Sequence, residues 1–215
     1  MSGSLAGVRI VNGKPIRSGH RLLTDWLLDA TIYFSFDSSG FRRHQRSAPQ
    51  DFKVRDNAHV LVTGANSGVG FALCEQLMRR NVQVTLLCRS LTRGDAAIER
   101  LIKSFPSAPK PRLLLADITD LQAIDDAIDV LRDDVKSDHL PPISCLIHNA
   151  GILPLTQSFT STGHELAVAA HLIGPMRLTH ALFDCMAEGG RIIFMSSGGM
   201  YFAPLSVKKM LAYNV

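Results

Sequence analysis

The sequence predicts an α/β protein built on a doubly wound parallel sheet. Short and almost continuously apolar runs alternate with amphipathic helical patterns from residue 58 onward. Strands of that kind are typical of parallel sheets, because helices cover both of their faces. Alternation of strand and helix also gives a parallel order with right-handed connections. The first apolar run leads directly into a glycine-rich turn and then into a helix, which is how such a sheet commonly begins.

Each element follows from its local pattern. The strands are expected near residues 58–63, 82–88, 111–116, 143–148 and 190–196. The helices are expected near residues 68–80, 93–104, 120–136 and 162–187, the last with a break at Gly174 and Pro175. Loops rich in proline separate them at 105–109 and 139–142. Residues 58–215 therefore form one domain, whose sheet is incomplete on the C-terminal side.

Residues 1–57 read as an N-terminal extension with an amphipathic helix at about 21–36. Its apolar stripe has helical spacing, with Asp25 and Asp29 outside it. This helix is expected to dock on the domain or on a partner. A membrane contact is the alternative, but an acidic polar face argues against anionic lipid. The stripe consists of Leu22, Leu23, Trp26, Leu27, Ala30, Tyr33 and Phe34.

Composition excludes several classes of function. The net charge is only +4, and the basic cluster at 42–46 has no interleaved aromatic residues, so a solvated loop is favoured over a nucleic-acid surface. Four cysteines without C-x-x-C spacing and eight scattered histidines predict no metal site. Reduced thiols and the lack of a signal peptide indicate the cytoplasm. No apolar run approaches the roughly 20 residues of a membrane span.

The turn after the first strand suits a nucleotide phosphate. Glycines there allow positive φ and let the backbone approach a pyrophosphate at the positive end of the next helix. The spacing is G-x-x-x-G-x-G, not the G-x-G-x-x-G of the usual dinucleotide turn. This Rossmann-type arrangement predicts cofactor contacts from Gly64, Asn66, Ser67, Gly68, Val69 and Gly70.

Two later positions concern the adenosine half of the cofactor. Arg89 follows the second strand, where an acidic residue would bond the ribose of NAD and an arginine would accept a 2′-phosphate. Arg89 therefore favours NADP(H), the other interpretation being a surface arginine. Asp117, followed by Ile118, could accept a hydrogen bond from the adenine amino group. Equally, Asp117 could cap the helix that starts near Thr119.

The last two strands also deliver candidate site residues. The fourth strand runs into Asn149, Ala150 and Gly151, where small residues let the backbone approach a cofactor and Asn149 can tie neighbouring strands together. The fifth strand ends at Ser196 and Ser197, whose hydroxyl groups face the ligand crevice of such a sheet.

In this order, the motifs resemble those of the short-chain dehydrogenase/reductase family over roughly residues 58–200. The match rests on the glycine turn, Arg89, Asp117-Ile118, His148-Asn149-Ala150-Gly151 and Ser196-Ser197. The resemblance implies hydride transfer between NADP(H) and a small carbonyl or alcohol substrate, with Ser197 as a catalytic hydroxyl and a possible homo-oligomer. The Ser-Ser-Gly-Gly-Met run and the N-terminal extension resemble a narrower branch, the dehydrogenase/reductase member 12 type.

The chain departs from this family pattern at two places. The tyrosine–lysine pair that moves the proton is absent, since neither Tyr201 nor Tyr213 has a lysine four residues further on. His171 stands where the family has an asparagine; it could order a water in the proton relay, or it could be a packed helix residue that weakens catalysis. Sequence alone therefore predicts either a truncated product of a longer reductase gene or a non-catalytic NADP(H)-binding module.

Overall fold

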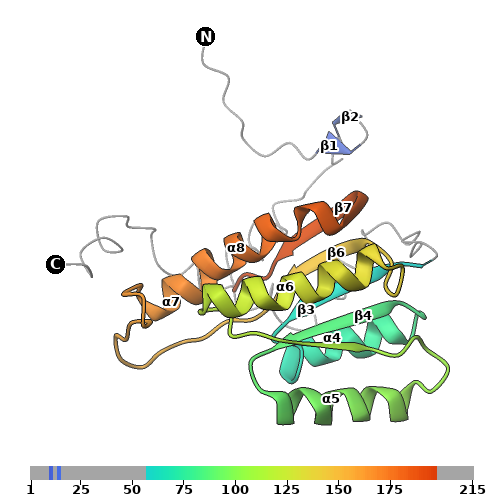
Figure 1. Cartoon of the computed structure of the whole chain (residues 1–215), viewed down its shortest axis with the longest axis horizontal. Coiled ribbons are helices and arrows are strands. Elements are labelled where there is room, and N and C mark those ends of the chain that lie inside the picture. The colour runs from blue at the N-terminus through green and yellow to red at the C-terminus, as the bar shows by residue number, and fades with distance from the viewer. Residues whose placement is uncertain (1–9, 12–13, 16–56, 198–215) are drawn as a thin grey trace, which may run out of the picture. The chain divides into compact units, whose positions relative to one another are not determined.

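The structure is a computed structural model that describes residues 10–11, 14–15 and 57–197 (Figure 1). The chain divides into two compact units, one of Met1–Phe52 with Ser196–Val215 and one of Lys53–Met195. In the first unit, β1 (Ile10–Val11) and β2 (Lys14–Pro15) pair in antiparallel fashion. The expected helix at 21–36 and the basic cluster at 42–46 lie outside the described residues.

The second unit contains the parallel sheet that the sequence predicts. Its strand order is β5-β4-β3-β6-β7, and each neighbouring pair is parallel. The chain thus winds outward from β3 in one direction and then in the other, which defines a doubly wound sheet. The strands are β3 (His59–Thr63), β4 (Gln83–Cys88), β5 (Arg112–Leu115), β6 (Ile143–His148) and β7 (Met186–Phe194).

Helices cover both faces of this sheet (Figure 1). One apolar core packs β3 residues Val60 and Val62 against α4 (Gly68–Met78) and α5 (Leu91–Ser104). The other core packs Leu61 of the same strand against α6 (Leu121–Lys136) and α8 (Gly174–Ala181). Successive side chains of a strand point to opposite faces. A strand between two helical layers is therefore mainly apolar, and the buried polar residues of β3, His59 and Thr63, are both hydrogen-bonded.

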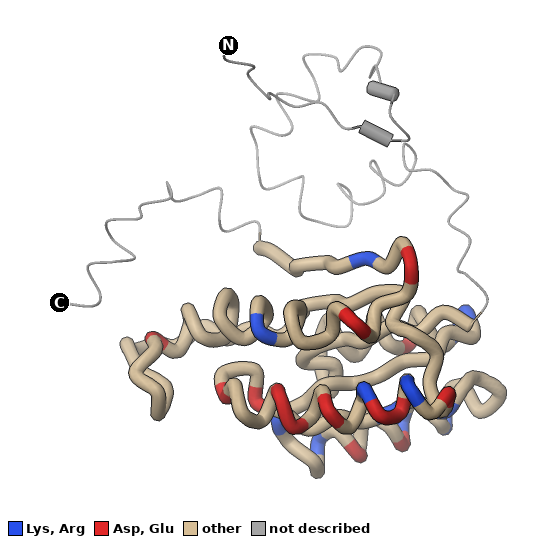
Figure 2. Tube along the Cα trace, turned by 45° about the horizontal axis from the view of Figure 1, so that its top comes forward, with Lys and Arg blue, Asp and Glu red and all other residues tan. Residues whose placement is uncertain are grey.

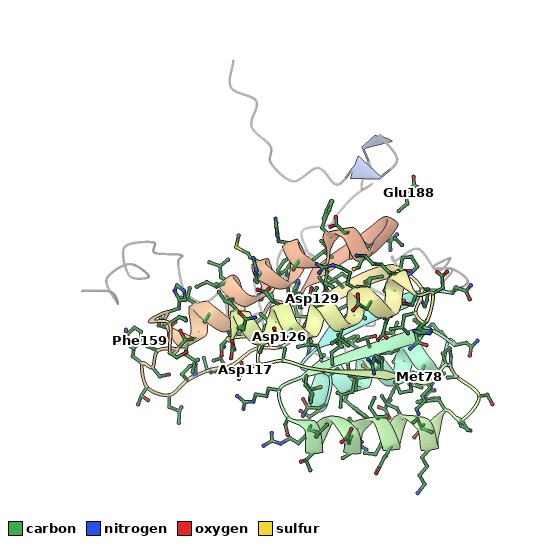
Figure 3. The ribbon with its side chains drawn as sticks, in the orientation of Figure 1. Met78, Asp117, Asp126, Asp129, Phe159 and Glu188 are labelled. Carbon is green, nitrogen blue, oxygen red and sulfur yellow. The ribbon has the colours of Figure 1, made fainter. Side chains whose placement is uncertain are left out.

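Ion pairs join α6 to its neighbours. Arg177 of α8 donates two hydrogen bonds to Asp125, at 2.8 and 2.6 Å, and lowers the pKa of that carboxyl group. Arg112 of β5 pairs with Asp134 at 2.9 Å. Figure 2 shows that acidic residues (red) outnumber basic ones (blue) along α6; Figure 3 labels two of them, Asp126 and Asp129, and Asp129 pairs with Arg132 of the same helix. This face has the wrong charge for a nucleic-acid backbone.

The region after β6 differs from the sequence expectation. Residues 162–165 are not helical; α7 spans only Leu166–Val168 and continues into a π-helical turn, Ala169–Ile173. Gly174 and Pro175 do not break a helix but begin α8, because a proline in the first turn needs no N–H partner. A short 3₁₀ turn, Phe183–Cys185, then leads into β7.

Strand β7 begins earlier than the predicted residue 190. It pairs Met186 with Ile143, bulges, and resumes with Arg191 opposite Cys145. Gly189, in the bulge, has φ +65°; Figure 3 labels the preceding residue, Glu188. Met186 and Ala187, expected at the end of the preceding helix, therefore belong to this strand, and α8 already ends at Ala181. The bulge conceals the start of the strand because it interrupts the apolar run.

Candidate functional site

A crevice of about 570 Å³ lies where β3, β4, β5 and β6 end. Parallel strands end at one edge of the sheet, so segments distant in sequence meet there. Figure 3 shows Asp117, just after β5, at the same end of the unit as the loop that carries Phe159. The predicted site residues that line the crevice are Gly64, Asn66, Ser67, Arg89, Asp117, Ile118, Asn149, Ala150 and Gly151.

The glycine turn leaves the N-terminal N–H groups of α4 accessible to an anion. Ser67, the N-cap residue, is extended, and its side chain makes no capping hydrogen bond. The first N–H groups of a helix lack intrahelical partners, so they remain available to a phosphate. Gly68 has φ +57° and open space where a Cβ would be, whereas a Cβ on Gly70 would lie 2.5 Å from the Gly64 oxygen. Gly68, Val69 and Gly70 form the first turn and do not line the crevice.

Thr63 connects the turn to the end of β6. Its buried hydroxyl accepts hydrogen bonds from the N–H groups of Asn149 at 3.0 Å and Ala150 at 2.9 Å. The same hydroxyl donates to the Ile147 carbonyl at 3.5 Å. The Asn149 amide donates in return to the Thr63 carbonyl at 3.0 Å. Asn149 therefore ties the two strands together, as the sequence predicts.

Two arginines follow β4 at the crevice. Arg89 is the predicted one, and Arg93 also lines the crevice. Helix α5 begins between them, two residues earlier than expected, because Ser90 is its N-cap and accepts from the Arg93 N–H at 3.4 Å. The signal that sequence reasoning missed was this serine, since it places Arg93 in the first turn of the helix.

Asp117 does not cap α6, so that interpretation is wrong. The helix begins at Leu121, and Asp120 caps it by accepting from the N–H groups of Gln122 at 3.0 Å and Ala123 at 3.2 Å. Asp117 instead accepts from the N–H and hydroxyl of Thr119, at 2.9 and 2.8 Å. These bonds hold its carboxylate at the wall of the crevice.

Two histidines stand beside the crevice rather than in its lining. His171 lies in the π-helical turn with Nε2 2.7 Å from the Ile152 carbonyl oxygen. His148 of β6 is 4% exposed; its Nε2 is 2.8 Å from the Thr179 hydroxyl, and its ring stacks on Phe194. Burial lowers the pKa of His148 to about 4. A neutral imidazole packed between Thr179 and Phe194 in this way has a structural role.

The remaining predicted residues do not belong to the second compact unit. Ser196 and Ser197 belong to the first compact unit, and the role of Ser197 stays a prediction. Tyr201 and Tyr213 lie outside the described residues. Within residues 57–197, no group of three or more histidine, cysteine or acidic side chains could hold a metal ion. The helices of the same region are too short or too polar to cross a membrane.

The crevice fits a dinucleotide cofactor. Uncapped helical N–H groups suit the pyrophosphate, and guanidinium groups and a carboxylate stand at the ends of β4 and β5. A doubly wound sheet with these features defines a nucleotide-binding protein of the Rossmann type. Residues 58–208 match the sequence profile of the family described as short chain dehydrogenase. The chain belongs to the short-chain dehydrogenase/reductase family of oxidoreductases, whose members use nicotinamide cofactors.

Similar proteins include three curated oxidoreductases. The short chain dehydrogenase/reductase dpchH of Colletotrichum higginsianum is 33% identical over 65% of this chain and 36% of its own length. Retinol dehydrogenase 11 of Mus musculus is 32% identical over 65% of this chain and 43% of its own. The human WW domain-containing oxidoreductase is 29% identical over 72% and 41%. The chain thus spans less than half the length of these relatives.

Solved structures agree with the fold. A bulky-bulky ketone specific alcohol dehydrogenase from Comamonas testosteroni has a TM-score of 0.55 and 26% identity over 68% of this chain and 57% of its own. A short-chain dehydrogenase from Sphingobium yanoikuyae, in complex with NADPH, has a TM-score of 0.53 and 28% identity over 65% and 53%.

Proposed function

We propose that this chain is the cofactor-binding part of an oxidoreductase that uses NADP(H) to interconvert a carbonyl and an alcohol by hydride transfer. The observation that carries the choice of cofactor is the pair of arginines, Arg89 and Arg93, that line the crevice just after β4. In a Rossmann-type sheet the adenine ribose lies at this position, and an arginine accommodates its 2′-phosphate.

The chemistry of these residues supports a phosphate rather than a free ribose. A guanidinium group presents planar, paired donors that match phosphate oxygens. The N-terminus of α5 lies between the two arginines in the sequence, and a helix N-terminus also favours negative charge. NADH carries no 2′-phosphate, so it would leave this positive charge without a partner.

The experiment is a comparison of NADPH and NADH binding by titration calorimetry of the 215-residue chain. Charge-assisted hydrogen bonds to a 2′-phosphate are each worth about 1.5–3 kcal/mol, so we expect NADPH to bind about 100-fold more tightly. The preference should shrink as salt is raised, because the arginines act in part through exposed charge. Equal affinities, or a tighter complex with NADH, would overturn the choice of NADP(H).

A non-catalytic NADP(H)-binding module, which regulates a partner or docks on it, is a second candidate. The residue that favours it is His171, which stands where the family has the asparagine of its proton relay and whose Nε2 lies 2.7 Å from the Ile152 carbonyl oxygen. The two candidates share the cofactor and differ in turnover. Oxidation of NADPH by any member of a panel of aldehydes and ketones supports the enzyme; tight NADPH binding without oxidation supports the module.

The partners we propose are a small carbonyl or alcohol substrate and a second copy of the chain, in the cytoplasm. The four cysteines, all of them described, are free thiols, which suits a reducing compartment. Fractionation of cells that express the tagged chain tests the compartment. Light scattering of the purified chain tests the homo-oligomer, and a monomer at micromolar concentration would contradict it.

A further inference from the structure

His171 makes its hydrogen bond with the backbone of a crevice residue. Its Nε2 is 2.7 Å from the Ile152 carbonyl oxygen and 3.3 Å from the Ile152 nitrogen. A neutral imidazole nitrogen either donates or accepts, so it satisfies one of these backbone groups at a time. The shorter distance favours donation from Nε2–H to the carbonyl. Ile152 and its neighbour Gly151 both line the crevice.

The ring and its helix lie tightly against two walls of the crevice. A Cβ on Gly151 would lie only 2.7 Å from Cε1 of His171, so the ring sits directly against the Gly151 backbone. One turn further along, a Cβ on Gly174 would lie 1.8 Å from the Ile118 carbonyl oxygen. Ile118 lines the crevice as well. The π-helical turn that carries His171 and the start of α8 therefore pack against crevice residues that follow β6 and β5.

Gly151 and Ile152, the residues against which His171 packs, line only one half of the crevice. A dinucleotide lies across the point where the strand order reverses, with one mononucleotide on each side. Arg89 and Asp117 follow β4 and β5, on the adenosine side. Gly151 and Ile152 follow β6, on the opposite side of β3, where the nicotinamide half would lie.

We propose that His171 is a positioning residue that fixes the wall formed by Gly151 and Ile152 for the nicotinamide half of the cofactor. It acts through the backbone of Ile152 and does not itself contact the cofactor. The inference rests on the proposed NADP(H) binding, and it adds a role for a side chain that stands outside the crevice lining.

The test compares two ligands in matched variants of the 215-residue chain. NADPH reaches both halves of the crevice, whereas adenosine 2′,5′-bisphosphate reaches only the adenosine half. His171→Ala should weaken NADPH about five- to tenfold, the effect of losing one hydrogen bond. It should leave the bisphosphate within twofold of the wild-type affinity. His180→Ala is the control, because His180 of α8 is exposed like His171 but lies outside the crevice lining; it should match the wild-type chain for both ligands.

A conservative variant should restore the NADPH affinity. In His171→Asn the amide N–H₂ can donate to the Ile152 carbonyl while its oxygen accepts from the Ile152 N–H, so NADPH affinity should return to that of the wild-type chain or exceed it. Gly151→Ala should reproduce the defect of His171→Ala, because the added methyl group displaces the ring. This second variant keeps the test available if His171→Ala does not fold.

Each outcome decides one question. An unchanged NADPH affinity in His171→Ala, an equal loss for both ligands, or a failure of His171→Asn to restore binding overturns the positioning role. Failure of the wild-type chain to bind either ligand overturns the proposed function instead. Amide hydrogen exchange without ligand then still tests the contact between His171 and Ile152. His171→Ala should speed exchange in residues 149–155, and His180→Ala should not. Equal exchange rates in the two variants would refute the contact.

Discussion

Acidification should destabilise the chain between pH 6.5 and about 4 because of His148. Its ring is buried, and its Nδ1 has no hydrogen-bond partner among the described residues. Burial disfavours the charged form and lowers the pKa from 6.5 to about 4. The unfolded chain therefore takes up a proton first as the pH falls below 6.5. The free energy of unfolding then decreases until the pH reaches the pKa of the folded state.

The size of this effect follows from the shift. A pKa lowered from 6.5 to about 4 corresponds to a loss of at most about 3 kcal/mol. Two other groups bear on the measurement. Burial also lowers the pKa of His59, which acts in the same direction. Arg177 lowers the pKa of Asp125 below 3.8, so stability from that carboxylate is lost only at lower pH, outside the window.

Urea unfolding at pH 7.5, 6.5, 5.5 and 4.5 measures the effect, with His148→Asn as the test variant. Asparagine can still bond the Thr179 hydroxyl but does not titrate, so the wild-type chain should lose about 2 kcal/mol more than this variant by pH 4.5. His180→Asn, at an exposed position, should follow the wild-type curve. Parallel curves for the wild-type chain and His148→Asn would refute the argument, because the buried imidazole would then contribute nothing to the pH dependence.

Three further predictions concern the turn, the cofactor and a helix cap. Gly68→Ala adds a methyl group in open space at φ +57°, so it should lower the free energy of unfolding in urea by about 1–2 kcal/mol and abolish most NADPH binding. Gly70→Ala, whose methyl group would be crowded against the Gly64 oxygen, should mainly lower the melting temperature. Identical behaviour of the two variants would contradict this. Arg89→Asp should shift the ratio of NADPH to NADH affinity toward NADH, and an unchanged ratio refutes the assigned contact. Asp120→Ala should cost about 1 kcal/mol in urea unfolding while Asp120→Ser retains the cap, and equal midpoints would mean that the cap contributes nothing.

The sheet could be predicted from the sequence because its strands are buried on both faces. Short, mainly apolar runs located β3 and β6 to within a residue, since a strand covered on both faces has this composition. The crevice followed from the same pattern. Once the strand ends are known, a parallel sheet brings Gly64, Arg89, Asp117 and Asn149 to one edge.

The region from 162 to 190 could not be predicted in the same way. The π-helical turn at Ala169–Ile173 depends on tertiary contacts, namely those of His171 with Ile152 and of Gly174 with Ile118. Local periodicity contains no sign of such contacts. The early start of β7 was missed because the helical pattern was extended to residue 187, and because Gly189, at positive φ in the bulge, interrupts the strand pattern. Ile152 was missed because an apolar residue after a strand carries no chemical signal of its own.

Thr63 has a consequence for how inherited or engineered variants would be interpreted. One hydroxyl links the end of β3 to the end of β6 next to the glycine turn, so a substitution such as Thr63→Val should lower both the abundance of the protein and its affinity for the proposed cofactor. In cells, a modest loss of stability can lower steady-state protein several-fold. A ligand that binds only the folded state counteracts such a loss by mass action. Variants at Thr63 should therefore be temperature-sensitive, and a richer supply of cofactor should partly rescue them.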